Sequence, residues 1–187
     1  WVKKKKAWAQ NLMGKKYRDG EGVKQSHEMA RILYEQAAQQ GDASALCSLG
    51  AMYNNGLGVE KSYEKAAEYY EQAANLGFAA AQFNLGIMYR YGQGVTQSYA
   101  RAKEYFELAV EQEHTEAIFC LACLYANGEG VERDLTKARE LFTKAAEQGN
   151  ETAIKYLQKL DDMEREAAAL DPNAIVCSSC GLPQTST

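Results

Sequence analysis

The chain has 187 residues, of which 46% are hydrophobic and 25% are charged, and its formal net charge at pH 7 is −4. Acidic and basic residues are mixed, which argues against a general nucleic-acid binder, because such a protein carries a basic face. No apolar run is long enough to cross a bilayer, and none follows the N-terminal lysines as it would in a signal peptide. Because the sequence begins with Trp1 rather than Met, we expect the chain to be a fragment of a longer protein.

A module of 36 residues repeats along most of the chain. Its clearest mark is the stretch Gly-x-Gly-Val, and each occurrence begins 36 residues after the one before. The four occurrences are Gly20–Val23, Gly56–Val59, Gly92–Val95 and Gly128–Val131. An aromatic residue, a small residue and an alanine also recur every 36 residues at fixed positions of the module. A repeat of this length without insertions is typical of a helical solenoid.

The predicted elements begin with a basic extension over residues 1–6. Four repeats follow, each with a first helix, a glycine turn and a second helix, and they span 7–42, 43–78, 79–114 and 115–150. The helices are expected over 7–18, 26–40, 43–55, 62–76, 79–91, 98–112, 115–127 and 134–148. A capping helix is expected over 151–168, before a tail over 169–187 of different composition.

The repeat has a physical explanation. Glycine in the turn readily takes the left-handed conformation that ends a helix. A glycine within the first helix, such as Gly50 or Gly86, lets the partner helix approach closely. In the last helix Gln158 stands where the first helices of the repeats have a small residue, and Asp161 stands where they have a tyrosine. A terminal cap needs such a polar outer side. The second helices are expected to be capped by Ser26, Ser62, Ser98 and Asp134.

These residues resemble the Sel1-like repeat family. The match rests on Ala-x-Ala-x-x-x-Leu-Gly-x-x-Tyr-x-x-Gly-x-Gly-Val followed by Ala-x-x-Tyr/Phe-x-x-Ala-Ala. It is complete in the second and third repeats, has Ala122 for glycine in the fourth, and has Met13 for leucine in the first. The resemblance implies an all-α, right-handed α-solenoid of about four helix-turn-helix repeats. It also implies an adaptor that organises protein complexes, often beside signalling or protein-quality-control machinery.

The five cysteines form no recognisable disulfide framework, so a reducing compartment, cytoplasmic or nuclear, is expected. Cys177-x-x-Cys180-Gly looks like the opening of a small zinc finger, of the MYND type. Tetrahedral zinc needs four ligands, and this stretch supplies two, so Cys177 and Cys180 are predicted as a metal half-site. Incidental tail cysteines and a redox pair are the alternatives. No cofactor is expected in the solenoid.

No catalytic residue is predicted. The Gly-x-Gly stretch links two helices, whereas a dinucleotide loop follows a strand. His27 and His114 have no partner fixed by sequence spacing, and Cys120 and Cys123 are interpreted as small apolar residues.

Positions that vary between repeats on the first helices are expected to face the inner curve, by similarity to helical-repeat superhelices. There they form a groove with an apolar middle, flanked by amides and by Arg18 and Arg90. Asparagine can clamp the backbone of an extended peptide, and arginine favours a carboxylate or phosphate. The predicted partner-binding residues are Asn54, Asn55, Phe83, Ile87, Arg90, Tyr91, Phe119 and Asn127. The alternative is a solvated inner surface with the ligand elsewhere.

The favoured hypothesis is a non-catalytic scaffold that binds a peptide or partner protein in the concave groove. A second is the recruiting region of a larger enzyme or zinc-finger protein whose chemistry lies outside this sequence. A third, nucleic-acid binding through Lys3–Lys6, Lys15, Lys16 and Arg18, requires steep salt dependence. No membrane partner is expected.

Overall fold

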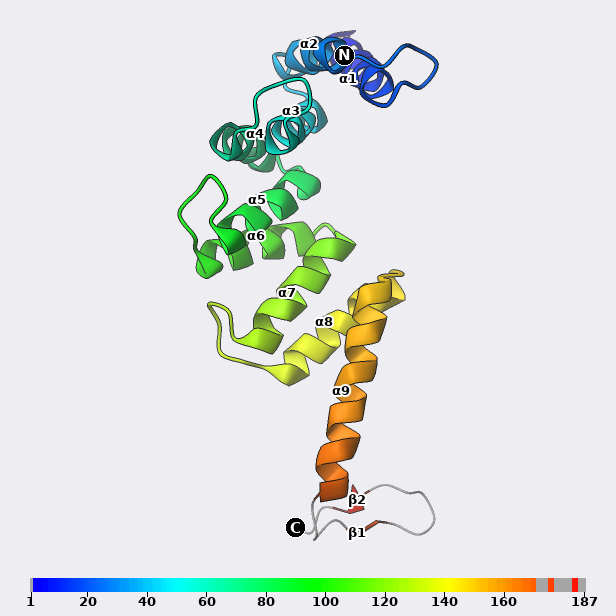
Figure 1. Ribbon diagram of the computed structural model, residues 1–187, viewed down its shortest axis with the longest axis vertical. Coiled ribbons are helices and arrows are strands. Elements are labelled where there is room, and N and C mark those ends of the chain that lie inside the picture. The colour runs from blue at the N-terminus through cyan, green and yellow to red at the C-terminus, as the bar shows by residue number, and fades with distance from the viewer. Residues whose placement is uncertain (1, 171–174, 177–182, 185–187) are drawn as a thin grey trace.

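The computed structural model describes the backbone of residues 2–170, 175–176 and 183–184, and the side chains of residues 6–166. This part of the chain holds nine helices in four pairs and a final helix, followed by a short antiparallel strand pair (Figure 1). The helices are α1 (Val2–Asp19), α2 (His27–Ala38), α3 (Ala43–Asn55), α4 (Tyr63–Asn75), α5 (Ala79–Tyr91), α6 (Tyr99–Val110), α7 (Thr115–Asn127), α8 (Leu135–Glu147) and α9 (Glu151–Leu170). The strands are β1 (Ile175–Val176) and β2 (Pro183–Gln184).

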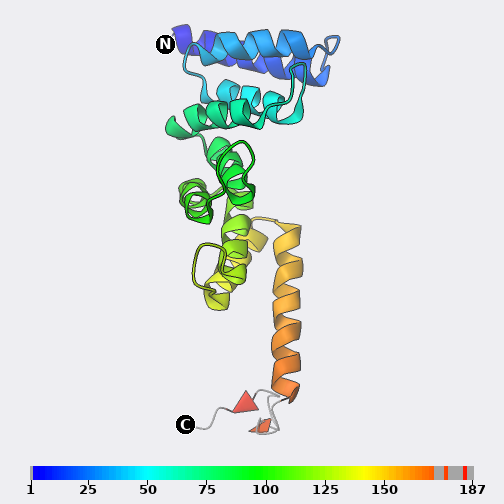
Figure 2. The same ribbon diagram turned by 60° about the vertical axis from the view of Figure 1, so that its left-hand side comes forward.

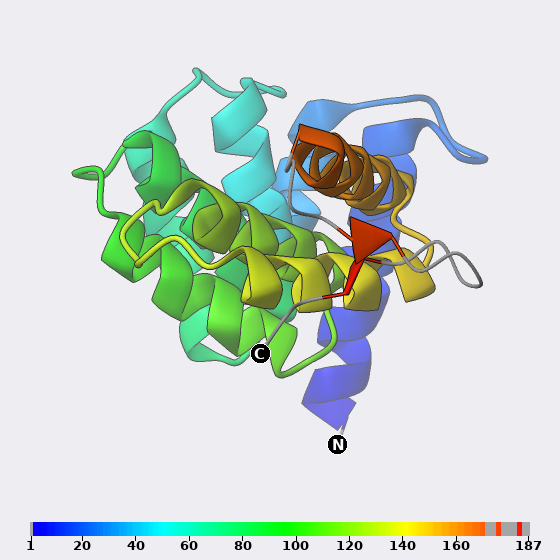
Figure 3. The same ribbon diagram turned by 90° about the horizontal axis from the view of Figure 1, so that it is seen from below.

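The predicted all-α solenoid of four repeats and a C-terminal helix is confirmed. Each first helix packs on its own second helix, and each second helix packs on the first helix of the next pair. The pairs form an elongated stack, in which successive pairs point in different directions around the long axis (Figures 1 and 3). The helix α9 extends past the last pair (Figure 2).

The two ends of the chain add details to the sequence analysis. Helix α1 begins at Val2, so the basic segment, which was expected to continue the first helix or an upstream one, belongs from Val2 on to the first helix. The strand pair in the tail was not predicted, because two-residue strands leave no pattern in the sequence.

The predicted caps are confirmed. In α2 the Ser26 hydroxyl accepts a hydrogen bond from the Met29 N–H, and in α8 Asp134 accepts one from the Lys137 N–H. Ser62 and Ser98 cap α4 and α6 in the same way. Helix α5 ends at Gly92, whose φ of 68° is left-handed and favours glycine.

Glycines inside the first helices bring the two helices of a pair together. A Cβ atom on Gly86 would lie 2.6 Å from a ring carbon of Phe106, and one on Gly50 would lie 2.7 Å from the Tyr70 ring. Phe106 is fully buried as a result. The predicted close approach is therefore an aromatic ring of the second helix packed against a glycine of the first.

The second glycine of the turn makes a different contact in the second, third and fourth repeats. It packs on the N-terminus of the second helix in the preceding repeat, where a Cβ atom would collide with backbone or Cβ atoms. Gly58 packs there on His27, Gly94 on Tyr63 and Gly130 on Tyr99. This contact joins one repeat to the next.

Candidate partner-binding face

The first helices α1, α3, α5, α7 and α9 lie next to one another and form one continuous row. The Asn11 side chain of α1 donates to Asp42 before α3, at 3.1 Å, and the Phe119 ring of α7 lies 5.6 Å from the Tyr156 ring of α9. Asn84 of α5 contacts the Cys47 thiol of α3. We call the exposed side of this row the first-helix face. All eight predicted partner-binding residues lie on these helices.

Arg90 is paired within the chain. Its guanidinium donates two hydrogen bonds to the Glu129 carboxylate, at 2.8 and 3.2 Å, and Asn127 donates a third at 2.8 Å. Burial raises the pKa of Glu129, but the hydrogen bonds from Arg90 and Asn127 outweigh it, so the pKa lies below its ordinary value. Arg90 and Asn127, both predicted to bind a partner, therefore bind the carboxylate of Glu129 in the turn after α7. The charge of Arg90 is already neutralised by this carboxylate.

Phe83 and Phe119 lie in the seams between repeats. The Phe83 ring stacks on His114, with centroids 5.0 Å apart and an interplanar angle of 22°. The Phe119 ring lies 5.6 Å from Phe142 of α8. Both phenylalanines and Ile87 are half-buried against the core. The predicted apolar middle of the groove is therefore a packed floor with part of each ring accessible.

The amides of Asn54 and Asn55 lie at the end of α3. Asn54 donates to the Asn55 side-chain oxygen at 3.3 Å, and Asn55 donates to the carbonyl of Ala51 at 2.9 Å. Asn55 is exposed and Asn54 is half-buried. Each amide has more hydrogen-bonding capacity than these contacts use. The second predicted arginine, Arg18, pairs with its neighbour Asp19 at 2.7 Å.

Large apolar side chains are exposed at both ends of the first-helix face and near its middle. Trp8 of α1 is 64% exposed and Tyr91 of α5 is 59% exposed. Of these, only Tyr91 belongs to the predicted set. The sequence did indicate that Trp8 is unusual. The second and third repeats have the small residues Ser44 and Ala80 at the same position, so the repeat itself does not need a large ring there. The remaining exposed apolar residues of the face are Leu12, Met13, Ile154, Tyr156 and Met163.

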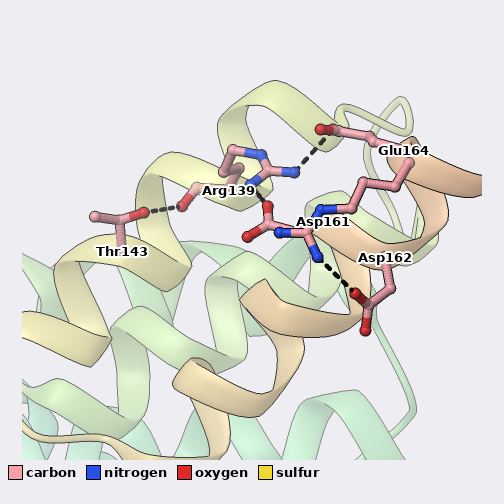
Figure 4. Close-up of polar contacts among 6 residues, drawn as sticks. Arg139, Thr143, Asp161, Asp162 and Glu164 are labelled. Carbon is pink, nitrogen blue, oxygen red and sulfur yellow. Dashed lines mark hydrogen bonds and ion pairs between the residues drawn. The ribbon is translucent and has the colours of Figure 1, made fainter. Parts of the chain in front are cut away.

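Helix α9 is fixed to α8 by one arginine. Arg139 of α8 donates to Asp161 and, at 2.8 Å, to Glu164, both on α9 (Figure 4). Thr143 donates to the backbone carbonyl of Arg139 at 2.9 Å. The polar residue Asp161, predicted to mark the cap, therefore serves to hold the last helix in register with the stack.

The described histidines, cysteines and carboxylates are dispersed along the solenoid. Among side chains 6–166 no group of three or more His, Cys, Asp or Glu residues could hold a metal ion. Burial raises the pKa of the Cys120 thiol to about 12, which leaves it a poor nucleophile. Cys177 and Cys180 lie outside the described residues, and two thiolates alone do not complete a tetrahedral zinc site. In the described part of the chain, no helix combines the length and apolarity that a bilayer span needs.

The repeats match a known family. The Sel1 repeat matches residues 9–42, 43–78, 79–114 and 115–150. The crystal structure of c5321, a protective antigen of uropathogenic Escherichia coli strains, is 37% identical with a TM-score of 0.78, and the match covers 86% of this chain and 34% of that one.

Two further solved structures share the fold. A Sel1 repeat protein from Oxalobacter formigenes is 30% identical over 86% of this chain and 73% of its own, with a TM-score of 0.76. Helicobacter pylori cysteine rich protein B is 23% identical over 68% of this chain and 96% of its own, with a TM-score of 0.53, and shows the fold alone. Comparison with curated proteins gave no match. The four matched repeats and the related structures establish that the chain belongs to the Sel1 repeat family.

Proposed function

We propose that the chain is a non-catalytic scaffold that binds an extended peptide or a partner protein along the first-helix face. Sel1 repeat proteins are generally protein-interaction scaffolds, and the proposal names the surface that this chain would use. The observation that carries it is the exposure of Trp8 and Tyr91. Trp and Tyr are enriched among the residues that dominate binding energy at interfaces.

The contrast with the second helices supports this choice of face. Their recurring aromatic residues are buried and stabilise the solenoid, three of them against a glycine of the first helix and Phe142 in the repeat that has Ala122 in that place. They are Tyr34, Tyr70, Phe106 and Phe142. Trp8 and Tyr91 are instead largely exposed, and the contact described for the Tyr91 ring is the Arg90 guanidinium at 5.4 Å. Rings exposed in this way are available to a partner.

The predicted residues would divide their roles. Tyr91 would anchor the partner, and the amides of Asn54, Asn55 and Asn127 would hydrogen-bond its backbone. Ile87, Phe83 and Phe119 would form the floor beneath it. Arg90 would act through Glu129, by holding the turn after α7 in place. This role for the repeats is the same whether they act alone or recruit a partner for a larger protein.

Site-specific photo-crosslinking tests the proposal. A benzophenone amino acid replaces Tyr91 in one protein and, as a matched control, Leu108 of α6, which is 42% exposed on a second helix. Both proteins are irradiated in lysate of the source organism, and the adducts are identified by mass spectrometry. We expect protein adducts at position 91 that are absent at 108 and that weaken in a Trp8→Ala background. Equal adducts at both positions, or adducts at 108 alone, would reject the first-helix face.

A further inference from the structure

A cavity of about 190 Å³ opens at the C-terminal end of the first-helix face, between the end of α7, helix α8 and the side of α9 that carries Tyr156 and Met163. Its floor includes Phe142, which is fully buried, so the cavity reaches the core. The apolar lining comprises Ala126, Leu135, Phe142, Tyr156, Leu160 and Met163. The polar rim comprises Asn127, Arg133 and Lys159.

The cavity exists because the repeat pattern stops here. In the three preceding repeats, the second glycine of the following turn covers the N-terminus of the second helix, as Gly130 covers Tyr99. Leu135 is the residue in phase with Tyr99, and Glu166 is in phase with Gly130. Helix α9 runs on through Glu166 instead of turning, so no glycine turn packs on Leu135. At this end of the stack Leu135, Tyr156 and Met163 are exposed by 40%, 43% and 48%.

The rim carries positive charge that none of the described carboxylates neutralises. The surrounding carboxylates are already paired: Asp161 and Glu164 with Arg139, and Asp162 with Arg165 (Figure 4). Among the described side chains no carboxylate lies within 4.0 Å of the Lys159 amine or the Arg133 guanidinium. Arg133 donates only to the backbone carbonyl of Ala126, at 3.1 Å.

We propose that this cavity holds one large apolar side chain of the partner, such as Phe, whose neighbouring Asp or Glu side chain pairs with Lys159 and Arg133. The proposal rests on the proposed function and names the chemistry of the partner segment. The size agrees, since an engineered apolar cavity of about 150 Å³ accommodates benzene. The apolar lining selects the ring, and the two rim cations select an acidic neighbour over a basic one.

The test is an NMR titration of the isotope-labelled chain with three short peptides: Ac-Asp-Phe-Asp-NH2, Ac-Lys-Phe-Lys-NH2 and Ac-Asp-Ala-Asp-NH2. We expect the first peptide to shift the amide signals of Asn127, Leu135 and Met163. Replacing its Phe by Ala should weaken binding about tenfold or more, because a buried ring contributes about 1.5–3 kcal/mol. Replacing its acids by Lys should weaken binding about fivefold, because exposed ion pairs contribute up to about 1 kcal/mol.

Two variants complete the test. Met163→Glu places a charge in the cavity and should abolish the shifts of the amide signals. The fold should survive this substitution, because Met163 is 48% exposed. Lys159→Glu should remove most of the preference for the acidic peptide, because the rim would then carry one cation and one carboxylate. Leu108→Glu on α6 is the matched control and should bind like the parent chain. Equal binding of the three peptides, shifts confined to other parts of the face, or unchanged binding by Met163→Glu would each overturn the proposal.

The two proposals fail separately. If crosslinks form at position 91 and the cavity signals do not move, the cavity proposal is wrong and the first-helix face stands. If the cavity signals move and position 91 gives no crosslinks, the cavity binds a ligand and the proposed binding along the whole face is wrong.

Discussion

Arg90 of α5 and Glu129 in the turn after α7 form an ion pair with two hydrogen bonds, which ties the third repeat to the fourth. The side chains are only 13% and 24% exposed, so the pair is partly desolvated. Glu129→Gln would leave the guanidinium without its charge partner. We expect it to lower the free energy of unfolding by about 1–2 kcal/mol at pH 7. Urea unfolding followed by circular dichroism measures this.

The sign of the pH dependence follows from the pKa of Glu129, which lies below its ordinary value of 4.5 in the folded chain. The pair therefore contributes its full stability above pH 4.5 and loses it as the pH falls through the lowered pKa. The difference between the parent and Glu129→Gln should shrink in the same range. A cycle with Arg90→Gln should give a coupling of about 1 kcal/mol. The control is the pair Lys103–Glu107, which is more exposed, and its coupling should be about 0.5 kcal/mol or less. Equal couplings for the two pairs would refute the prediction.

Glu113 occupies a backbone position that favours glycine. Its φ is 59°, and the residues in phase with it are Gly41, Gly77 and Gly149, with φ values of 81°, 80° and 88°. The left-handed region costs a non-glycine residue about 1–2 kcal/mol. Glu113→Gly removes this strain, but glycine also gains freedom in the unfolded chain, so we expect a net stabilisation of about 0.5–1 kcal/mol. Thermal and urea unfolding measure the change.

Gly77→Glu is the matched reverse change. No heavy atom outside its chain neighbours lies within 4 Å of a Cβ atom built on Gly77, so only the backbone conformation should matter. We expect Gly77→Glu to destabilise the chain by about 1 kcal/mol. If both substitutions changed stability in the same direction, the strain at Glu113 would not be the cause.

The fold could be predicted because its signals are local and recur. Gly92 ends a helix and Ser98 begins the next one, and both roles depend on residues a few positions away. The seams between repeats were harder, because variation between repeats was interpreted as surface exposure. Phe83 stacks on His114, and in the same place two repeats earlier Asn11 bonds to Asp42. The two contacting positions thus hold a different matched pair in each of these repeats. A position that varies between repeats can therefore still be buried.

The cavity beside α9 was missed for a related reason. It arises from a contact that the last helix does not make, and the sequence of α9 was interpreted only as a polar cap. Its lining residues Tyr156 and Met163 are separated in sequence from Leu135 and become neighbours only through the packing of α9 on α8. The Arg90–Glu129 pair likewise joins residues 39 positions apart.

The three cysteines within the solenoid should be unreactive in the folded chain. Burial raises the pKa of the Cys47 and Cys123 thiols to about 11 and that of Cys120 to about 12. At pH 8 the thiolate fraction of each is then about 0.1% or less. In a Cys177→Ser/Cys180→Ser background, we expect slow reaction with a thiol reagent in buffer and rapid reaction of all three in guanidinium. Ala100→Cys, at an exposed position, is the reactive control, and a buried thiol that matched its rate would contradict the pKa shifts.

Phe83 and Tyr91, two turns apart on α5, should respond differently to truncation. Phe83 is half-buried in a seam, so Phe83→Ala should lower the free energy of unfolding by about 2 kcal/mol. Tyr91 is 59% exposed, so Tyr91→Ala should change it by about 0.5 kcal/mol or less. Once crosslinking has named the partner, Tyr91→Ala should weaken its binding about tenfold or more. Unchanged binding by Tyr91→Ala, with Leu108→Ala as the matched control, would remove Tyr91 from the interface, because its fold is expected to be intact.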